Sequence, residues 1–149
     1  MPKIDKNKIA TGFIGLKSNT TKAQMFRSII DSIAFSIKIK MNLILKDLKS
    51  NNISLRSIRI SGGVSRSNFF CQYLSNLLEF SIERSETSST SSTFGAAFLA
   101  GLGAGLFESI NELENFRRNV EIFKPDKKTN YDQNIRDWET SLKRFTNWN

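Results

Sequence analysis

The sequence has no histidine and only one cysteine, Cys71, among its 149 residues. A zinc site usually takes four Cys or His ligands, so this composition excludes a zinc site of the usual kind. A single cysteine also excludes a disulfide within the chain. The sequence therefore predicts neither a metal site nor an internal cross-link.

A long hydrophobic run is also lacking. The N-terminal stretch MPKIDKNKIA has no apolar core of the kind found in signal peptides. The most apolar segment, residues 94–107, is shorter than the about 20 residues that a helix needs to cross a bilayer. These two absences predict a cytoplasmic protein without a membrane span.

Acidic residues are outnumbered, with 14 Asp and Glu against 22 Lys and Arg, which gives a formal net charge of +8. A basic balance can indicate nucleic acid, a membrane surface or a phosphorylated ligand as partner. Here the cations are dispersed, their densest groups are residues 117–118 and 124–128, and no stripe interleaves basic and aromatic side chains. We therefore expect solvated charges and no nucleic-acid partner.

The first half of the chain alternates helical and strand patterns. Thr21 and Gln24 form a capping box ahead of apolar residues at helical spacing. This pattern predicts one long helix of roughly 27 residues that ends near residue 50. The elements predicted after it are a strand over residues 55–60, a helix over residues 69–78 and a strand over residues 79–84. No internal repeat is visible, and the alternation favours an α/β layer architecture.

The second half begins with the polar tract ETSSTSST, residues 86–93, which is typical of a solvated loop. A third helix is predicted over residues 93–106, and Ser109 and Glu112 form a second capping box after it. A short strand over residues 120–123 is expected next. A last helix should then pack through one apolar face made of Tyr131, Ile135, Trp138, Leu142 and Phe145.

Two glycines, Gly62 and Gly63, lie between the first predicted strand and the second helix, in the stretch ISGGVSRSNFF. Glycine permits positive φ and removes the Cβ atoms that would block a ligand. The helix beyond it offers unpaired N–H groups and a partial positive charge at its N-terminus. The pattern is compatible with a turn that a nucleotide approaches, but two glycines alone favour a tight strand-to-helix turn that binds nothing.

A second glycine cluster, GLGAG at residues 101–105, looks like a dinucleotide-binding fingerprint but lacks the third glycine and lies inside a helical pattern. We interpret it as a site of close helix packing. Small residues keep one side of this helix thin, so that another element or a flat ligand can approach. They are Gly95, Ala96, Ala97, Ala100, Gly101 and Ala104.

Several segments, in the expected order, resemble the glycerol kinases among the FGGY carbohydrate kinases, within the actin, Hsp70 and hexokinase superfamily. SGGVSRSNFFCQYLSNLL is followed by FGAAFLAGLGAGLF, and IFKPD and YDQNIRDWETSLKRFTNW close the chain. The stretch GFIGLKSNTTKAQMFRSIIDSIAF resembles the family's second signature. Its matching positions are Gly15, Leu16, Gln24, Met25, Ser28, Ile29, Ile30 and Asp31.

The resemblance implies an α/β fold, namely the C-terminal portion of an actin-like, ribonuclease H-like ATPase domain with short strands and flanking helices. Residues 11–118 would form the C-terminal part of the family's second domain. Residues 119–149 would add a strand and a helix that pack on it.

The resemblance also implies the ATP- and Mg²⁺-dependent phosphorylation of glycerol, with a Gly-Gly turn under the adenosine and α-phosphate of ATP. Gly62 and Gly63 would form that turn. Ser67 stands where glycerol kinases usually have Asn, and Asn68 follows directly, so both are predicted to bind nucleotide. The chain departs from the family at further positions: Ser61 replaces a frequent Asp, Ser85 replaces a Pro, and Ser/Thr residues replace an acidic one before GAA.

Glycerol kinases are much longer than this chain. Their first domain, phosphate loops and general base would precede Gly12, so no catalytic residue is predicted here and the isolated chain is expected to be inactive. Its expected partners are ATP, glycerol and the missing N-terminal kinase domain, and the resemblance allows a homo-oligomer. Two alternatives stay open: a kinase of another polyol or a pentulose, and a non-catalytic fragment that binds nucleotide or protein.

Overall fold

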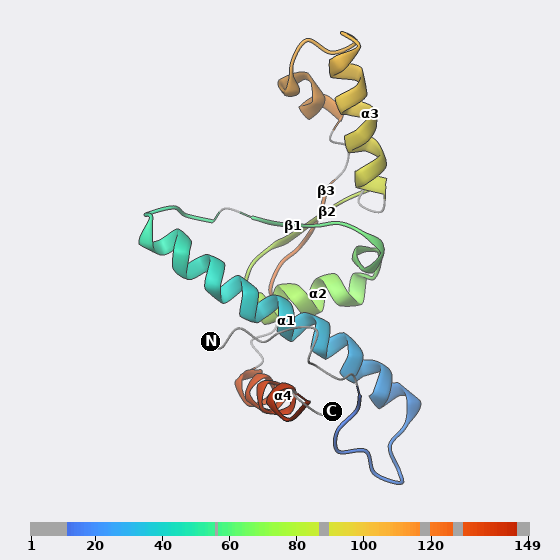
Figure 1. Ribbon diagram of the computed structural model, residues 1–149, viewed down its shortest axis with the longest axis vertical. Helices are drawn as coiled ribbons and strands as arrows, with labels where there is room; N and C mark the ends of the chain where they lie inside the picture. The colour runs from blue at the N-terminus through green and yellow to red at the C-terminus, as the bar shows by residue number, and fades with distance from the viewer. Residues whose placement is uncertain (1–11, 56, 87–89, 117–119, 127–129, 146–149) are drawn as a thin grey trace. The chain divides into compact units, whose positions relative to one another are not determined.

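The computed structural model describes residues 12–55, 57–86, 90–116, 120–126 and 130–145, whose helices and strands are labelled in Figure 1. The chain divides into two compact units. The first is Met1–Ile44 together with Thr129–Asn149, and the second is Leu45–Lys128. The division predicted at residue 118 concerns family domains rather than contacts, and it stays a prediction.

Helix α1 (Lys22–Ser50) begins in the first unit and has 29 residues, close to the predicted length. The capping box at its start is confirmed in both directions. The hydroxyl of Thr21 accepts from the Gln24 N–H at 3.2 Å, and the Gln24 side-chain oxygen accepts from the Thr21 N–H at 2.9 Å. This exchange satisfies two of the donors that a helix N-terminus leaves without intrahelical partners. The position at which α1 begins is therefore set by the side chains of Thr21 and Gln24, which lie within four consecutive residues.

Helix α4 (Asp132–Phe145) also belongs to the first unit. Its predicted apolar face is partly covered, since Ile135, Trp138, Leu142 and Phe145 are half-buried, although no α4 residue is fully buried. The Trp138 ring meets Phe35 of α1 edge to face, with ring centroids 6.3 Å apart. Phe35 is itself buried, so this aromatic pair is a main apolar contact of the first unit.

We expect Trp138→Ala to lower the melting temperature by about 3 to 6 °C, because removing a large, half-buried side chain costs about 1.5 kcal/mol and a chain of this size loses about 2 to 4 °C for each kcal/mol. Thermal unfolding followed by circular dichroism measures this shift. Asn134→Ala is the matched control, since Asn134 is exposed on the same helix and should change stability by less than about 0.5 kcal/mol. Equal melting temperatures for the two variants would show that α4 does not pack through Trp138.

The second unit is built on a three-stranded sheet in the order β1-β2-β3. Strand β1 (Ile58–Ile60) pairs in parallel with β2 (Ile82–Ser85), and β2 pairs antiparallel with β3 (Val120–Phe123). All three predicted strands are confirmed, but the first two are shorter at their N-terminal ends than predicted. The strands begin only where a partner strand lies opposite, which the sequence pattern does not show.

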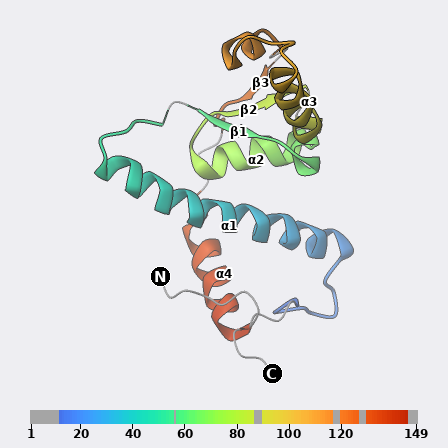
Figure 2. The ribbon, with the colours of Figure 1, turned by 45° about the horizontal axis from the view of Figure 1, so that its top comes forward.

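Helix α2 (Asn68–Leu78) lies along one face of this sheet (Figure 2). It buries its apolar side, which includes Phe70, Cys71, Tyr73, Leu74, Leu77 and Leu78, together with Ile82 of β2 and Phe123 of β3. The buried hydroxyl of Ser75 donates to the carbonyl oxygens of Phe80 and Phe123, each at 2.8 Å. A buried hydrogen bond therefore joins α2 to β3 inside an otherwise apolar core.

Helix α3 (Ser91–Gly103) is apolar on all sides, and Gly101 is its only buried residue. A Cβ on Gly101 would lie 2.5 Å from the Phe107 ring, so the predicted close packing is confirmed at this glycine. It is not seen at Gly95, Gly103 or Gly105, where the described residues leave open space around a Cβ. The rings of Phe94, Phe98, Phe107 and Phe116 form a chain of contacts beside it. Several large apolar side chains here are nevertheless exposed, namely Phe94, Leu99 (71%), Leu106 (77%) and Phe116.

The second predicted capping box, Ser109 with Glu112, is wrong. A 3₁₀ helix, η4 (Ile110–Phe116), forms at this point. Its geometry lets the Glu112 N–H donate to the backbone carbonyl of Ser109 at 3.3 Å, so the serine hydroxyl is not needed as acceptor. The Glu112 carboxylate accepts from the Glu108 N–H at 3.0 Å instead. None of the helices described in the structure is both long and apolar enough to cross a membrane.

Candidate nucleotide-binding site

The Gly-Gly turn directly follows the carboxyl end of β1. Gly62 has φ 93° and ψ −179°, a conformation that is essentially restricted to glycine. Gly63 has no positive φ and begins the short 3₁₀ helix η2 (Gly63–Arg66), which leads into α2. The two glycines therefore have different roles, because the backbone requires glycine at position 62 but not at position 63.

The turn is held from its inner side by Ser65, which is fully buried. The Ser65 N–H and hydroxyl both donate to the Gly62 carbonyl, at 3.2 and 2.7 Å. In a planar trans peptide the N–H points opposite to the carbonyl, so the Gly63 N–H points away from Ser65. Apart from Gly63 and its two neighbours in the chain, no atom of the described residues lies within 4 Å of the position that a Cβ on Gly63 would take. The outer side of Gly63 is therefore open backbone with a donor directed outward.

Ser67 and Asn68, the other two predicted site residues, lie at the start of α2. The Ser67 hydroxyl caps this helix by accepting from the Phe70 N–H at 3.2 Å. The side-chain oxygen of Asn68 accepts from Arg84 at 2.7 Å. The structure thus brings all four residues into one short segment, and it gives Ser67 and Asn68 structural contacts that the sequence pattern did not predict.

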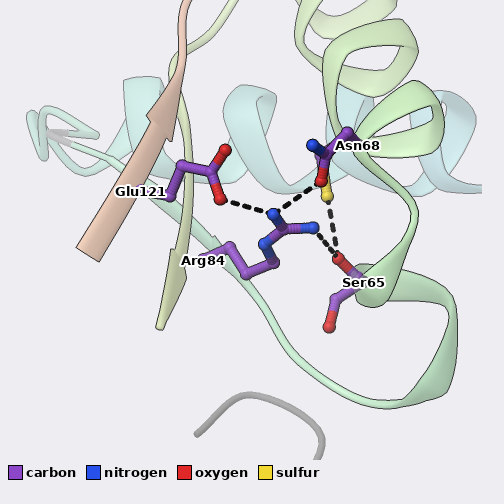
Figure 3. A network of polar contacts seen from close by, with 5 residues as sticks. Ser65, Asn68, Arg84 and Glu121 are labelled. Carbon is purple, nitrogen blue, oxygen red and sulfur yellow. Dashed lines mark hydrogen bonds and ion pairs between the residues drawn. The ribbon is translucent and has the colours of Figure 1, made fainter. Parts of the chain in front are cut away.

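Arg84 of β2 is the residue that sequence reasoning missed (Figure 3). Its guanidinium donates to the Ser65 carbonyl at 2.7 Å, to Asn68, and to the Glu121 carboxylate of β3. It also lies over the Phe123 ring, 5.0 Å from the centroid, and only 14% of its side chain is exposed. Arg84 therefore joins η2, α2 and β3 at one point.

The strand register explains why Arg84 reaches the turn. Ile60, the last residue of β1, pairs with Arg84, and Glu121 pairs with Arg84 from the other side. Because β1 and β2 are parallel, the residues at their carboxyl ends meet at the same edge of the sheet. The single signal in the sequence was an arginine at the end of a predicted strand, and that signal does not identify its partners.

Cys71 lies beneath the same network. Its thiol is fully buried and donates to the Ser65 carbonyl at 3.2 Å. Burial raises the pKa of the thiol, and the nearby charge of Arg84 partly opposes that rise. Since the thiolate is the reactive form, a raised pKa means less thiolate at neutral pH.

We expect the Cys71 thiol to react with Ellman's reagent at least about 100-fold more slowly in the native chain than in urea, because it is both buried and protonated. The measurement compares the two rates at pH 8. A native rate close to the rate in urea would mean that the contact between α2 and η2 opens readily.

A groove of about 680 Å³ lies in the first unit, lined by residues such as Phe13, Ser28 and Trp138. Its serine hydroxyls donate to helix carbonyls; Ser28, for example, donates to Met25 at 2.7 Å. The groove contains none of the predicted site residues. Within the described part of the chain, no three His, Cys, Asp or Glu side chains gather as a metal site would require.

A family model described as the C-terminal domain of the FGGY family of carbohydrate kinases matches residues 3–104 of this chain. Human glycerol kinase 5 is 36% identical over 137 residues, which cover 91% of this chain. Glycerol kinase of Borreliella afzelii is 30% identical over 136 residues, again 91% of the chain. The chain spans about a quarter of the length of these relatives, 25% and 26% respectively.

Two solved structures share the fold. Plasmodium falciparum glycerol kinase with ADP matches 88% of this chain and 26% of its own chain, with a TM-score of 0.65 and 23% identity. Ligand-bound xylulose kinase from Lactobacillus acidophilus matches 90% of this chain and 25% of its own, with a TM-score of 0.52 and 23% identity. These matches confirm the predicted α/β class and the C-terminal portion of a kinase fold.

Proposed function

Because the chain belongs to the FGGY family of carbohydrate kinases, whose C-terminal domain it matches, we propose that it forms the nucleotide-binding part of an ATP-dependent glycerol kinase. The observation that carries this proposal is the open outer side of Gly63 at the carboxyl end of β1. In open α/β sheets, ligands bind at the carboxyl ends of the strands. The turn has the position and the bare backbone that this role needs.

The residues of the turn would bind nucleotide in complementary ways. The open backbone at Gly63 allows the ribose and phosphates to approach, and its outward N–H can donate to a phosphate oxygen. Gly62 sets the direction of that donor through its own carbonyl, which Ser65 holds. Ser67 and Asn68 add side-chain groups at the start of α2. These contacts place the nucleotide without making or breaking a bond.

Phosphoryl transfer depends mainly on positioning and on stabilising charge, with Mg²⁺ neutralising the phosphates and a base orienting the acceptor hydroxyl. We propose that Mg²⁺ arrives with the nucleotide and that the general base belongs to a preceding kinase domain. Asp31 is not a candidate base, because its carboxylate pairs with Arg27 on α1 at 2.8 Å. This chain would therefore supply nucleotide binding rather than bond chemistry.

Glycerol is proposed as the acceptor because the sequence relatives that reach 30% identity or more include glycerol kinases of human and bacterial origin. A pentulose is the second candidate, since a xylulose kinase shares the fold. Because the acceptor site would lie outside this chain, the test uses the complete kinase that contains the chain and measures ADP release with glycerol, xylulose and ribulose. A higher kcat/KM for a pentulose than for glycerol would reject glycerol as the substrate.

A non-catalytic role is the alternative of a different class. It is compatible with a chain that spans only a quarter of its relatives. The exposed apolar surface of α3 is compatible with both roles, because large apolar side chains left in water usually mark a surface that packs against more polypeptide. Titration of the 149-residue chain with ADP, followed by nuclear magnetic resonance, separates these roles. Shifts at Gly63 and Asn68 support nucleotide binding, and their absence supports a protein-binding fragment.

A further inference from the structure

We infer that Arg84 is a positioning residue of the nucleotide site, which fixes the Asn68 amide so that its NH₂ group donates to the adenosine of the nucleotide. This inference rests on the proposed function. Arg84 of β2 would thereby contribute to the site, and Asn68 would act as a hydrogen-bond donor to the ligand. Figure 3 shows the network in which Arg84 contacts both η2 and α2.

The orientation of the Asn68 side-chain amide follows from the chemistry of its partner, Arg84. A guanidinium group has five N–H donors and no acceptor, so only the side-chain oxygen of Asn68 can face it. The observed contact joins Nη2 of Arg84 to Oδ1 of Asn68 at 2.7 Å. The amide nitrogen of Asn68 is therefore turned away from Arg84, and it donates to no other residue of the described chain. A ligand at the start of α2 would meet a donor there rather than an acceptor.

The same guanidinium also fixes the turn. Nη1 of Arg84 donates to the Ser65 carbonyl at 2.7 Å, and Ser65 in turn holds the Gly62 carbonyl at 2.7 Å. One side chain thus orients both groups that are proposed to bind the ligand, the Gly63 N–H and the Asn68 amide. A lysine could make only one of these contacts well, because its ammonium is a point charge rather than a planar fork.

Arg84 is itself held rigidly enough for this task. The Phe123 ring lies beneath its guanidinium, 5.0 Å from the ring centroid, and its side chain is 14% exposed. Glu121 is 52% exposed, so it contacts Arg84 from the solvent side. Glu121→Gln is therefore a charge control, since it removes the carboxylate charge while the Gln side-chain oxygen can still accept from Arg84.

The experiment titrates the 149-residue chain with ADP and with uncharged adenosine, by calorimetry, well below the melting temperature of each variant. Arg84→Lys and Arg84→Met should each weaken both ligands about tenfold, and Glu121→Gln should leave both affinities within twofold. Asn68→Asp keeps an acceptor for Arg84 but has no NH₂ group, so it should weaken adenosine about tenfold without lowering the melting temperature.

Adenosine removes phosphate repulsion as an explanation for the Asn68→Asp result, and Arg84→Lys removes loss of charge as an explanation for Arg84. Full affinity in Arg84→Lys, or tighter ADP binding in Glu121→Gln, would show that Arg84 acts only through its charge and would overturn its positioning role. Unchanged adenosine affinity in Asn68→Asp would overturn the assigned donor. If the unaltered chain binds neither ligand, the proposed nucleotide site falls as well, which distinguishes that failure from the others.

Discussion

Gly63→Ala should lower the affinity for ATP by more than about tenfold, or about 1.4 kcal/mol, in a complete kinase that contains this chain. The added Cβ would stand on the open side of the turn, where the nucleotide is proposed to approach. It should cost little stability, because Gly63 has no positive φ and, among the described residues beyond its immediate chain neighbours, no atom lies within 4 Å of the new methyl group. The measurement is the Michaelis constant for ATP beside a melting curve.

Gly62→Ala is the control for backbone strain. Gly62 also has open space around a Cβ, but its φ of 93° penalises any side chain. This variant should lose about 1 to 3 kcal/mol of stability, the usual cost of a residue in such a region. The affinity for glycerol should change little in Gly63→Ala, since the acceptor site would lie elsewhere. An unchanged Michaelis constant for ATP in Gly63→Ala would mean that the turn only connects β1 to α2.

The second large effect concerns turnover. The isolated 149-residue chain should show no glycerol kinase activity, whereas complete kinases turn over about 1 to 100 times per second. The reason is that the general base and the first domain of the proposed enzyme would lie in the part of its relatives that this chain does not match. A coupled assay with purified chain, ATP, Mg²⁺ and glycerol measures ADP release.

The complementary experiment joins the chain to the N-terminal portion of a related kinase and repeats the same assay. Activity should then rise to the kinase range, and Gly63→Ala in the joined protein should raise the Michaelis constant for ATP. Turnover at the usual rate by the isolated chain would require a complete catalytic set within its 149 residues and would refute the division of labour proposed above.

Most features that depend on neighbouring residues could be predicted from the sequence, although the capping box of Ser109 and Glu112 is local and was wrong. The capping box of Thr21 and Gln24 and the spacing of apolar residues after it both lie within α1, and the structure confirms them. The Gly-Gly turn is also local, since two glycines between a strand and a helix specify a bare connection. Its division of roles between Gly62 and Gly63 could not be predicted, because it depends on φ at each glycine.

Features that depend on register could not be predicted. The contact of Arg84 with Asn68 joins residues 16 positions apart, and its contact with Glu121 joins residues 37 positions apart. Both follow from the pairing of Ile60 and Glu121 with Arg84 across the sheet. A pattern of alternating residues predicts that a strand exists, but it does not say which residue of another strand lies opposite.

The pairing of Ser85 with Val120 has a consequence for how this fold tolerates change in length. The segment between them, which carries α3 and η4, leaves the sheet and returns to it at adjacent positions on neighbouring strands. Closing a longer or shorter loop between fixed ends changes the free energy only slowly, by about 0.6 kcal/mol for each doubling of its length. Insertions and deletions in this segment should therefore leave β2, β3 and the Arg84 network intact. We expect related proteins to tolerate different lengths of this segment while the Gly-Gly turn stays unchanged.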